Sequence, residues 1–160
     1  MPGRGVVLLA LCVVDLCFNA SLEYDTFDDG ASTIPTLLFA AQFFVQVGAF
    51  ICLFLSLSNT YLYQVGIIEP LRRHFGLVLV LHIAYTLYTT FLGAMRMRLA
   101  LEMRPSLIRA YEYQTIHLYS ALSIIHKFVA VAYYRKNMAA TVTLQNPALY
   151  SHETSMSYAK

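Results

Sequence analysis

Hydrophobic residues gather in four long stretches of the chain, and polar residues fall mainly between them. The stretches run over 5–22, 36–57, 75–95 and 113–134. A helix needs about 20 apolar residues to cross roughly 30 Å of hydrocarbon, and backbone inside lipid must satisfy its own hydrogen bonds. The pattern therefore predicts an all-α membrane protein, a bundle of four transmembrane helices with short loops.

The four spans make up one predicted transmembrane domain, residues 1–134, and a cytosolic, flexible tail is expected over 135–160. The longest connections between spans are 58–74 and 96–112. Chains below about 40 residues usually need staples to hold a core, so neither connection makes a soluble domain. We therefore expect that the protein is not an enzyme and that it acts through its helices, loops or partners.

The first stretch has a second interpretation, because Arg4 before an apolar run also resembles a secretory signal peptide. Ala20 would be a tolerable last residue of such a signal, but Phe18 stands where a small residue is wanted. Asp15 also interrupts the apolar run. The sequence favours retention of this segment as the first helix, with cleavage as the alternative.

The distribution of lysine and arginine favours a cytosolic location for both termini, because cytoplasmic loops carry the excess of basic residues. This orientation places six basic residues inside: Arg4, Arg72, Arg73, Arg135, Lys136 and Lys160. It places four outside: Arg96, Arg98, Arg104 and Arg109. The first loop, with Glu23, Asp25, Asp28 and Asp29 and no basic residue, would also lie outside.

Composition agrees with a membrane protein and argues against several other classes. Hydrophobic residues make up 58% and charged residues 12%, against about 25% charged in ordinary soluble domains. A net charge of +2 with scattered basic residues predicts no nucleic-acid partner. Cys12, Cys17 and Cys52 lie inside apolar stretches as expected buried thiols, so no disulfide, metal or cofactor is indicated. The predicted partner is the lipid bilayer, and a homo-oligomer stays open.

Asp15 and Lys127 are the formally charged residues within the four spans. Charges at bilayer depth usually face the bundle interior and pair. Asp15 lies about 15 Å along its helix from Gly5, and Lys127 about 12 Å from Arg135, so their depths agree and a contact is predicted. Asn19 lies on the face of Asp15, and Gln42 stands in the second span. These polar groups predict hydrogen bonds between helices.

Two other interpretations of these polar groups stay open. The first is a small channel or proton-coupled transporter that uses Asp15, Lys127 and His82. The second is that Lys127 extends its side chain toward the cytosolic interface. His82, His117 and His126 lack the paired spacing of helical metal sites, so no metal is expected.

Two short motifs lie at or beyond the ends of the predicted spans. Asn19-Ala20-Ser21 is a formal glycosylation acceptor, but a weak one, because it sits at or inside the end of the first helix. The tail contains Asn146-Pro147-Ala148-Leu149-Tyr150, a turn before a tyrosine of the kind that sorting adaptors read. A plain turn in a flexible tail is the alternative.

With these residues in view, the chain resembles the transmembrane protein 138 family, small four-span proteins of ciliated cells. The most specific resemblance is the segment 59–66, Asn-Thr-Tyr-Leu-Tyr-Gln-Val-Gly. Further matching positions are Asp15, Asn19, Gln42, Lys127, Tyr134, Arg135, Lys136, Pro147 and Tyr150. The first loop is longer and more acidic than the family pattern, and Asn146 stands where an acid is expected.

The resemblance implies a function that composition does not. It implies a non-enzymatic protein required for building cilia, located at the ciliary base and transition zone and on vesicle or vacuole membranes. It also implies a scaffolding or sorting role, with membrane proteins of the ciliary base or ciliary cargo as partners. On this interpretation Asn59, Thr60, Gln64 and Gly66 would contact partners, and Asn146, Pro147 and Tyr150 would form a sorting signal.

Overall fold

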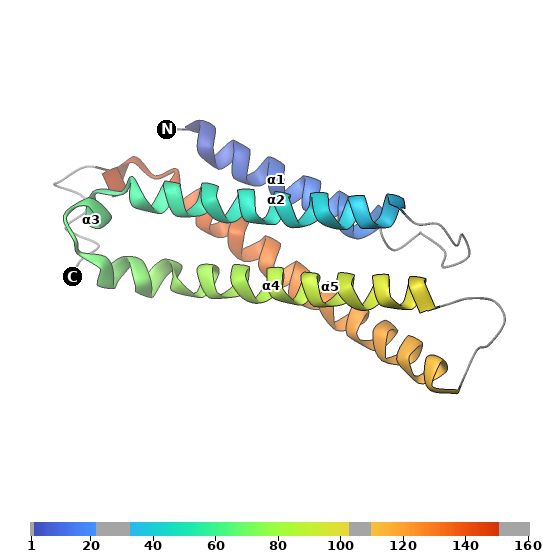
Figure 1. The fold of residues 1–160 in the computed structure, drawn as a ribbon. Coiled ribbons are helices and arrows are strands. Elements are labelled where there is room, and N and C mark those ends of the chain that lie inside the picture. The colour runs from blue at the N-terminus through green and yellow to red at the C-terminus, as the bar shows by residue number, and fades with distance from the viewer. Residues whose placement is uncertain (1, 22–32, 103–109, 151–160) are drawn as a thin grey trace.

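The computed structural model of the chain describes residues 2–21, 33–102 and 110–150, and these residues form helices joined by short connections (Figure 1). The elements in chain order are α1 (Pro2–Ser21), α2 (Thr33–Ser58), α3 (Tyr61–Gln64), α4 (Ile68–Glu102), α5 (Ala110–Leu144) and the 3-10 helix η1 (Pro147–Tyr150). The described part of the chain contains no strand, so the all-α fold class is confirmed.

The four long helices pack as two pairs. Helix α1 lies on α2, α4 lies on α5, and the pairs meet through contacts of α2 with α4 and of α1 with α5. In Figure 1, α5 crosses behind α4, so its first turns diverge from α1 and α2. The short helix α3, the start of α1 and η1 lie together at the opposite end. The bundle is therefore closed at the α3 end and splayed at the other.

Within the described residues, three helices are long and apolar enough to cross a membrane: Thr36–Ser58, Ile68–Leu99 and Ile116–Leu144. The apolar part of α1 is shorter and covers Gly5–Ala20. The chain is thus an integral, multi-pass membrane protein by the length and composition of its helices. Three of the four predicted spans are confirmed as helices of spanning length, and the crossing by α1 stays a prediction.

The predicted flexible tail over 135–160 was wrong in its first part, because α5 continues to Leu144 and η1 follows it. Arg135 and Lys136 form a basic pair, which in the sequence resembles the end of a span. In the structure both residues are exposed on a helix that continues. The inward-facing positions beyond them, Asn137, Ala140 and Leu144, stay buried and keep the helix packed. Helix α4 likewise begins at Ile68 rather than at 75.

The buried positions of the long helices recur at alternating spacings of three and four residues. In α4 they are Leu71, Phe75, Val78, His82, Tyr85, Thr89, Leu92 and Leu99. In α5 they are His126, Ala130, Tyr133, Asn137, Ala140 and Leu144, with Thr141 also buried beside Ala140. Such a repeat averages 3.5 residues per turn and is typical of helices packed with a left-handed supercoil. The bundle therefore follows coiled-coil packing rules, although many of its inward positions are polar.

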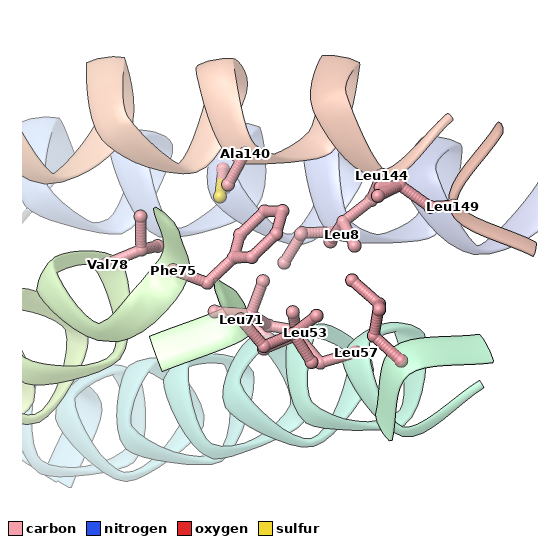
Figure 2. Close-up of a cluster of buried hydrophobic side chains, with 12 residues drawn as sticks. Leu8, Leu53, Leu57, Leu71, Phe75, Val78, Ala140, Leu144 and Leu149 are labelled. Carbon is pink, nitrogen blue, oxygen red and sulfur yellow. The ribbon is translucent and has the colours of Figure 1, made fainter. Parts of the chain in front are cut away.

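One half of the interior is apolar. Figure 2 shows side chains from several helices meeting there, with Phe75 among Leu8, Leu71 and Ala140. Leu62 of α3 and Leu149 of η1 belong to the same cluster. Large apolar side chains also cover the outer surface, where Phe44 and Phe128 are 71% and 74% exposed. An apolar exterior of this kind suits lipid, since lipid tails favour apolar side chains.

The predicted buried state of the cysteines holds in part. Cys12 is buried, Cys52 is half-buried, and Cys17 is exposed on the outer face of α1. The predicted orientation depends in part on the acidic residues of the first loop and on three basic residues, Arg104, Arg109 and Lys160. All of these lie outside the described part of the chain.

Candidate functional site

The other half of the interior contains a polar network centred on the carboxylate of Asp15, which is 2% exposed. Its Oδ1 accepts hydrogen bonds from the amides of Gln42 at 3.2 Å and Gln46 at 2.9 Å. Its Oδ2 accepts hydrogen bonds from the phenols of Tyr85 at 2.8 Å and Tyr134 at 2.6 Å. Because these donors belong to α2, α4 and α5, one side chain of α1 joins all four long helices.

Asn19 and Gln42 close the network around Asp15. The Asn19 amide donates to the phenols of Tyr85 at 2.6 Å and Tyr134 at 2.9 Å. The Gln42 amide donates to Asn19 at 2.8 Å as well as to Asp15. Both amides thus use both of their hydrogens inside the protein, and the carboxylate accepts at about all four of its lone-pair sites. The predicted roles of Asp15, Asn19 and Gln42 as contacts between helices agree with this geometry.

The predicted contact between Asp15 and Lys127 was wrong. The two amides and two phenols already occupy the carboxylate. Lys127 is exposed on α5, beside the buried His126. Its depth along the helix does not determine which face of the helix it occupies. The position of Lys127 on the helix turns it away from the packed centre, so neutral donors hold the acid instead.

Aromatic rings surround the network and extend it along α4 and α5. The ring of Tyr85 stacks on Tyr133 with centroids 4.2 Å apart, and on His126 at 5.2 Å. Thr89 and His126 share a hydrogen bond of 2.8 Å. The stacking restricts the ring of Tyr85, and Tyr134 packs edge-on against Tyr85 and Tyr133 with centroids 6.0 Å and 5.2 Å apart. Their role in the site is to position the network.

Four buried polar side-chain atoms have no hydrogen-bond partner among the described residues. They are Gln46 Oε1, His82 Nδ1, Thr86 Oγ1 and Asn137 Oδ1. The other ring nitrogen of His82 lies 3.0 Å from the Gln46 carbonyl oxygen, which can only accept, so Nε2 carries the proton. Unpaired buried atoms of this kind usually bind ordered water. His82 therefore serves as a contact between α2 and α4.

Sequence reasoning missed Tyr85 and Tyr134 as members of the site. The fourth predicted span ends at residue 134, a position at which a tyrosine is expected to lie at the membrane interface. Helix α5 in fact continues to Leu144, which places Tyr134 about 15 Å inside the helix end. The signal that could have found Tyr85 is the spacing His82, Tyr85, Thr89, a polar stripe with the same three-four repeat.

The glycosylation prediction for Asn19 conflicts with the structure. The Nδ2 atom that would carry the sugar is the donor to two phenols in a part-buried position. Helix α1 also continues through Ser21, so the acceptor lies within a helix. A glycan on Asn19 would therefore require the network to be taken apart.

A cavity of about 320 Å³ begins beside the polar network and extends toward the splayed end of the bundle. Its inner wall includes Asn19, Gln42 and Tyr134. The other lining residues are Leu16, Ala20, Phe39, Thr89, Leu92, Gly93, Arg96, Tyr119, Ser123, His126, Lys127, Ala130 and Val131. Ligand pockets in proteins commonly have volumes of about 300 to 1,000 Å³, so this cavity is large enough to hold a small ligand.

The segment 59–66 contains four predicted contact residues, and two of them have a structural role at the end of α2. Thr60 is fully buried and its hydroxyl donates to the Leu57 carbonyl at 2.7 Å, while the Asn59 amide donates to the Leu55 carbonyl. These bonds close the end of α2. Gln64 and Gly66 are exposed. Of the four predicted contact residues, the latter two thus remain on the surface.

Gly66 ends α3 with a positive φ of 79°. The Ile67 amide donates to the Leu62 carbonyl at 2.9 Å, and the Gly66 amide to Tyr63 at 3.1 Å. This is the Schellman motif, in which a residue without Cβ is favoured. The motif turns the chain into α4.

We expect Gly66→Ala to lower the free energy of unfolding by about 1 kcal/mol, because alanine at positive φ is strained. Denaturant titration in detergent micelles measures this loss. Gly76→Ala is the control, because a Cβ there meets Arg72 Cγ at an ordinary 3.6 Å. Equal stability of the two variants would contradict the explanation.

The predicted sorting signal in the tail is folded against the bundle. Leu149 is 3% exposed within the apolar cluster, and the Tyr150 hydroxyl donates to the Leu144 carbonyl at 2.8 Å. Asn146 and Pro147 are exposed. η1 also contacts α3, so the two segments predicted to bind partners form one surface at the closed end. An adaptor that reads Tyr150 in an extended tail would have to release η1.

Comparison with known sequences identifies one family. The model of the family described as transmembrane protein 138 matches residues 36–158. The match includes α2 to η1 and therefore Gln42, Lys127 and the segment 59–66, whereas Asp15 and Asn19 precede it. Neither curated proteins nor solved structures gave a match.

Proposed function

Since the chain belongs to the transmembrane protein 138 family, we propose that it is a non-enzymatic membrane protein required for the assembly of cilia. It acts as a scaffold or sorting factor at the ciliary base and transition zone and on associated vesicle or vacuole membranes. Its partners are other membrane proteins of the ciliary base or ciliary cargo. The family match over residues 36–158 is the observation that carries this proposal.

The architecture supports a scaffold. The polar interior is used to hold four helices together, as the bonds of Asp15 to α2, α4 and α5 illustrate. The surface formed by α3 and η1 lies outside the predicted spans and presents Gln64, Asn146 and Pro147. A partner bound there would be held by a platform whose inner side chains, Leu62 and Leu149, are fixed in the core.

The second candidate function, a small channel or proton-coupled transporter, has less support. It requires Asp15, Lys127 and His82 to exchange ions or protons along a path. Asp15 and His82 instead have hydrogen-bond partners that join helices. Ion flux in liposomes that changes on substitution of Lys127 or His82 would favour this candidate over the scaffold.

We expect that removal of the protein from ciliated cells reduces the fraction of cells with cilia and that the wild-type chain restores it. Gln64→Arg should restore it less than half as well at equal protein level, because it places a bulky charge on the proposed contact surface. Arg73→Ala, an exposed change at the start of α4, is the control and should restore fully. Cilia counts by microscopy and proximity labelling of neighbours measure the outcome.

Two results would contradict this scheme at different levels. Normal cilia in cells without the protein would contradict the proposed function itself. Full rescue by Gln64→Arg, with unchanged neighbours, would contradict only the contact surface on α3.

A further inference from the structure

The outer face of α5 carries a basic pair within an apolar surface. Exposed side chains recur along this face at alternating spacings of four and three residues. They are Ile124, Phe128, Val131, Arg135, Met138 and Val142. All but Arg135 are large and apolar, and Lys136 is exposed beside Arg135. This spacing is the repeat by which one helix packs on another, so the face suits a second helix as well as lipid.

Contacts inside the bundle show the level at which Arg135 lies. Its neighbour Tyr134 donates to Asp15 at 2.6 Å, and Ala140, further along α5, packs in the same cluster as Phe75 of the antiparallel α4. The exposed residues of the other helices near this level are Val13 and Val14 on α1, at 59% and 42%, and Leu77 and Val80 on α4, at 60% and 65%. The surface around the basic pair is therefore apolar on three helices.

The length of α2 places this level inside the hydrocarbon. Its spanning segment Thr36–Ser58 has 23 residues, or about 34 Å, so its ends lie near the two boundaries of a core roughly 30 Å thick. Ser56 and Asn59 line a small cavity together with Leu144, so α5 reaches the same boundary near Leu144. Arg135 lies about 13 Å before that residue along α5. Side chains tilt toward the N-terminus of their helix, which here is away from this boundary.

The basic pair has no counter-charge in the part of the chain that the structure describes. Neither Arg135 nor Lys136 forms an ion pair with a described residue, whereas Arg72 at the start of α4 pairs with Glu69. The acid of the predicted spans is Asp15, which is buried and accepts four hydrogen bonds. Charges at bilayer depth usually pair, because an isolated charge in hydrocarbon is costly.

Charge and depth together select one kind of occupant for this face. A phosphate of a lipid headgroup lies at the boundary, about 13 Å along the helix from Arg135. A second copy of the chain offers Asp15, which is enclosed in its own bundle, and Glu69, which lies at the start of α4 beside Arg72. A carboxylate on a spanning helix of another protein meets both requirements, because it is anionic and can lie at the depth of the basic pair.

We propose that the outer face of α5 binds a transmembrane helix of another protein, whose aspartate or glutamate pairs with Arg135 and Lys136 while its apolar residues pack on the stripe. This deepens the proposed function, on which it rests for the kind of partner, because it gives the chemistry of one membrane protein that the scaffold holds. The surface differs from the one formed by α3 and η1.

The experiment uses the full chain in phosphatidylcholine vesicles with a labelled, leucine-rich spanning peptide as the probe. The peptide has 23 residues, as the spanning segment of α2 has, and carries one glutamate about nine residues from one end. A second peptide has glutamine at that position, and a third has glutamate at its last residue. Energy transfer between dyes on chain and peptide measures association. We expect about tenfold tighter binding of the first peptide than of the other two, because charge-assisted hydrogen bonds are the stronger ones.

Substitutions on the chain assign this preference to the basic pair. Arg135→Gln should remove most of it, Lys136→Gln should remove part of it, and Arg135→Lys should keep it because the charge remains. Arg73→Gln, at an exposed basic position at the start of α4, is the control for charge. Met138→Ala should weaken all three peptides about two- to threefold through lost packing, whereas Leu77→Ala, at a position that is equally exposed at 60%, should not.

Several results would overturn the proposal. Equal binding of the glutamate and glutamine peptides would remove the charge argument, and an equal loss in Arg73→Gln would indicate a general surface effect. Loss of the preference when phosphatidylglycerol is added would assign the basic pair to lipid phosphates. Tighter binding of a second labelled copy of the chain than of the glutamate peptide would make the face a contact between copies. Circular dichroism identifies variants that have unfolded.

Failure of this proposal and failure of the proposed function are distinguishable. The vesicle assay contains no cilia, so a negative result there would remove the partner surface on α5 and leave the ciliary role in place. Normal cilia in cells without the protein would remove the ciliary role and leave the binding of an acidic helix in place.

Discussion

Asp15→Leu should lower the free energy of unfolding of the bundle by about 2 to 4 kcal/mol. The carboxylate accepts four hydrogen bonds from three other helices, and leucine accepts none. A hydrogen bond between helices in a membrane contributes about 0.6 kcal/mol on average and up to about 1.7. Donors left buried without a partner add further cost. The loss should appear chiefly as detachment of α1.

The sign of the change in the free energy of unfolding distinguishes an effect on helix packing from an effect on membrane insertion. Leucine favours insertion of a helix, whereas aspartate at its centre opposes insertion by about 2.5 to 3.5 kcal/mol. Asp15→Leu thus makes α1 a better membrane segment by composition. If insertion limited stability, the variant would be more stable than wild type, so destabilisation identifies the network as the cause.

Unfolding by denaturant in mixed micelles, followed by circular dichroism, measures the change, and proteolysis between α1 and α2 reports detachment. Asp15→Asn keeps an acceptor oxygen and should lose less than Asp15→Leu. Val13→Leu introduces leucine at a position of α1 that is 59% exposed and should be neutral within about 0.5 kcal/mol. Equal stability of Asp15→Leu and Val13→Leu would contradict the role of the carboxylate.

The helical fold was predictable because lipid allows few alternatives. Apolar length alone located α2, α4 and α5. Their ends were not predictable in the same way, since α5 passes Arg135 and Lys136 without a break in its buried stripe. A basic pair on the outer face of a helix resembles a basic pair at its end until the inward positions, such as Asn137 and Leu144, are considered. Hydropathy averages over both faces and loses this distinction.

The sequence indicated which polar residues belong to the site better than it indicated which of them form hydrogen bonds with each other. Asp15, Asn19 and Gln42 are polar groups that lipid disfavours, so their inward position followed from the sequence. The partner of Asp15 did not follow, because depth fixes only one coordinate and rotation about the axis fixes the other. Lys127 has the right depth and the wrong rotation, whereas Tyr85 and Tyr134 have both. Tyrosine is also counted among the apolar residues, so the phenols of Tyr85 and Tyr134 were not recognised as hydrogen-bond donors to Asp15.

The approach of α2 to α4 depends on a residue that no pattern singled out. Gly93 of α4 lies under the ring of Phe39 from α2, and a Cβ at this position would overlap three atoms of that ring. The absence of a side chain at Gly93 therefore lets the two helices meet at the level of the cavity. Small residues at helix contacts have this role in membrane bundles generally.

Gly93→Ala should accordingly lower the free energy of unfolding by about 1 to 3 kcal/mol, the range for overpacked sites, despite the better helix propensity of alanine. Gly76→Ala, on the same helix, should be neutral or stabilising by up to about 1 kcal/mol, because its Cβ meets only Arg72 Cγ at 3.6 Å. The two changes are chemically identical and are expected to differ in sign. Denaturant titration in mixed micelles measures both.

A second substitution assigns the loss to the ring. Phe39→Ala removes the atoms that the new methyl group would meet, so Gly93→Ala should cost much less in the Phe39→Ala background than in wild type. The difference between the two costs is the coupling energy of the pair, and residues in contact show values of about 0.5 to 3 kcal/mol. Additive effects of the two substitutions would mean that α2 and α4 do not approach each other through this contact, and the helix arrangement around the cavity would then need revision.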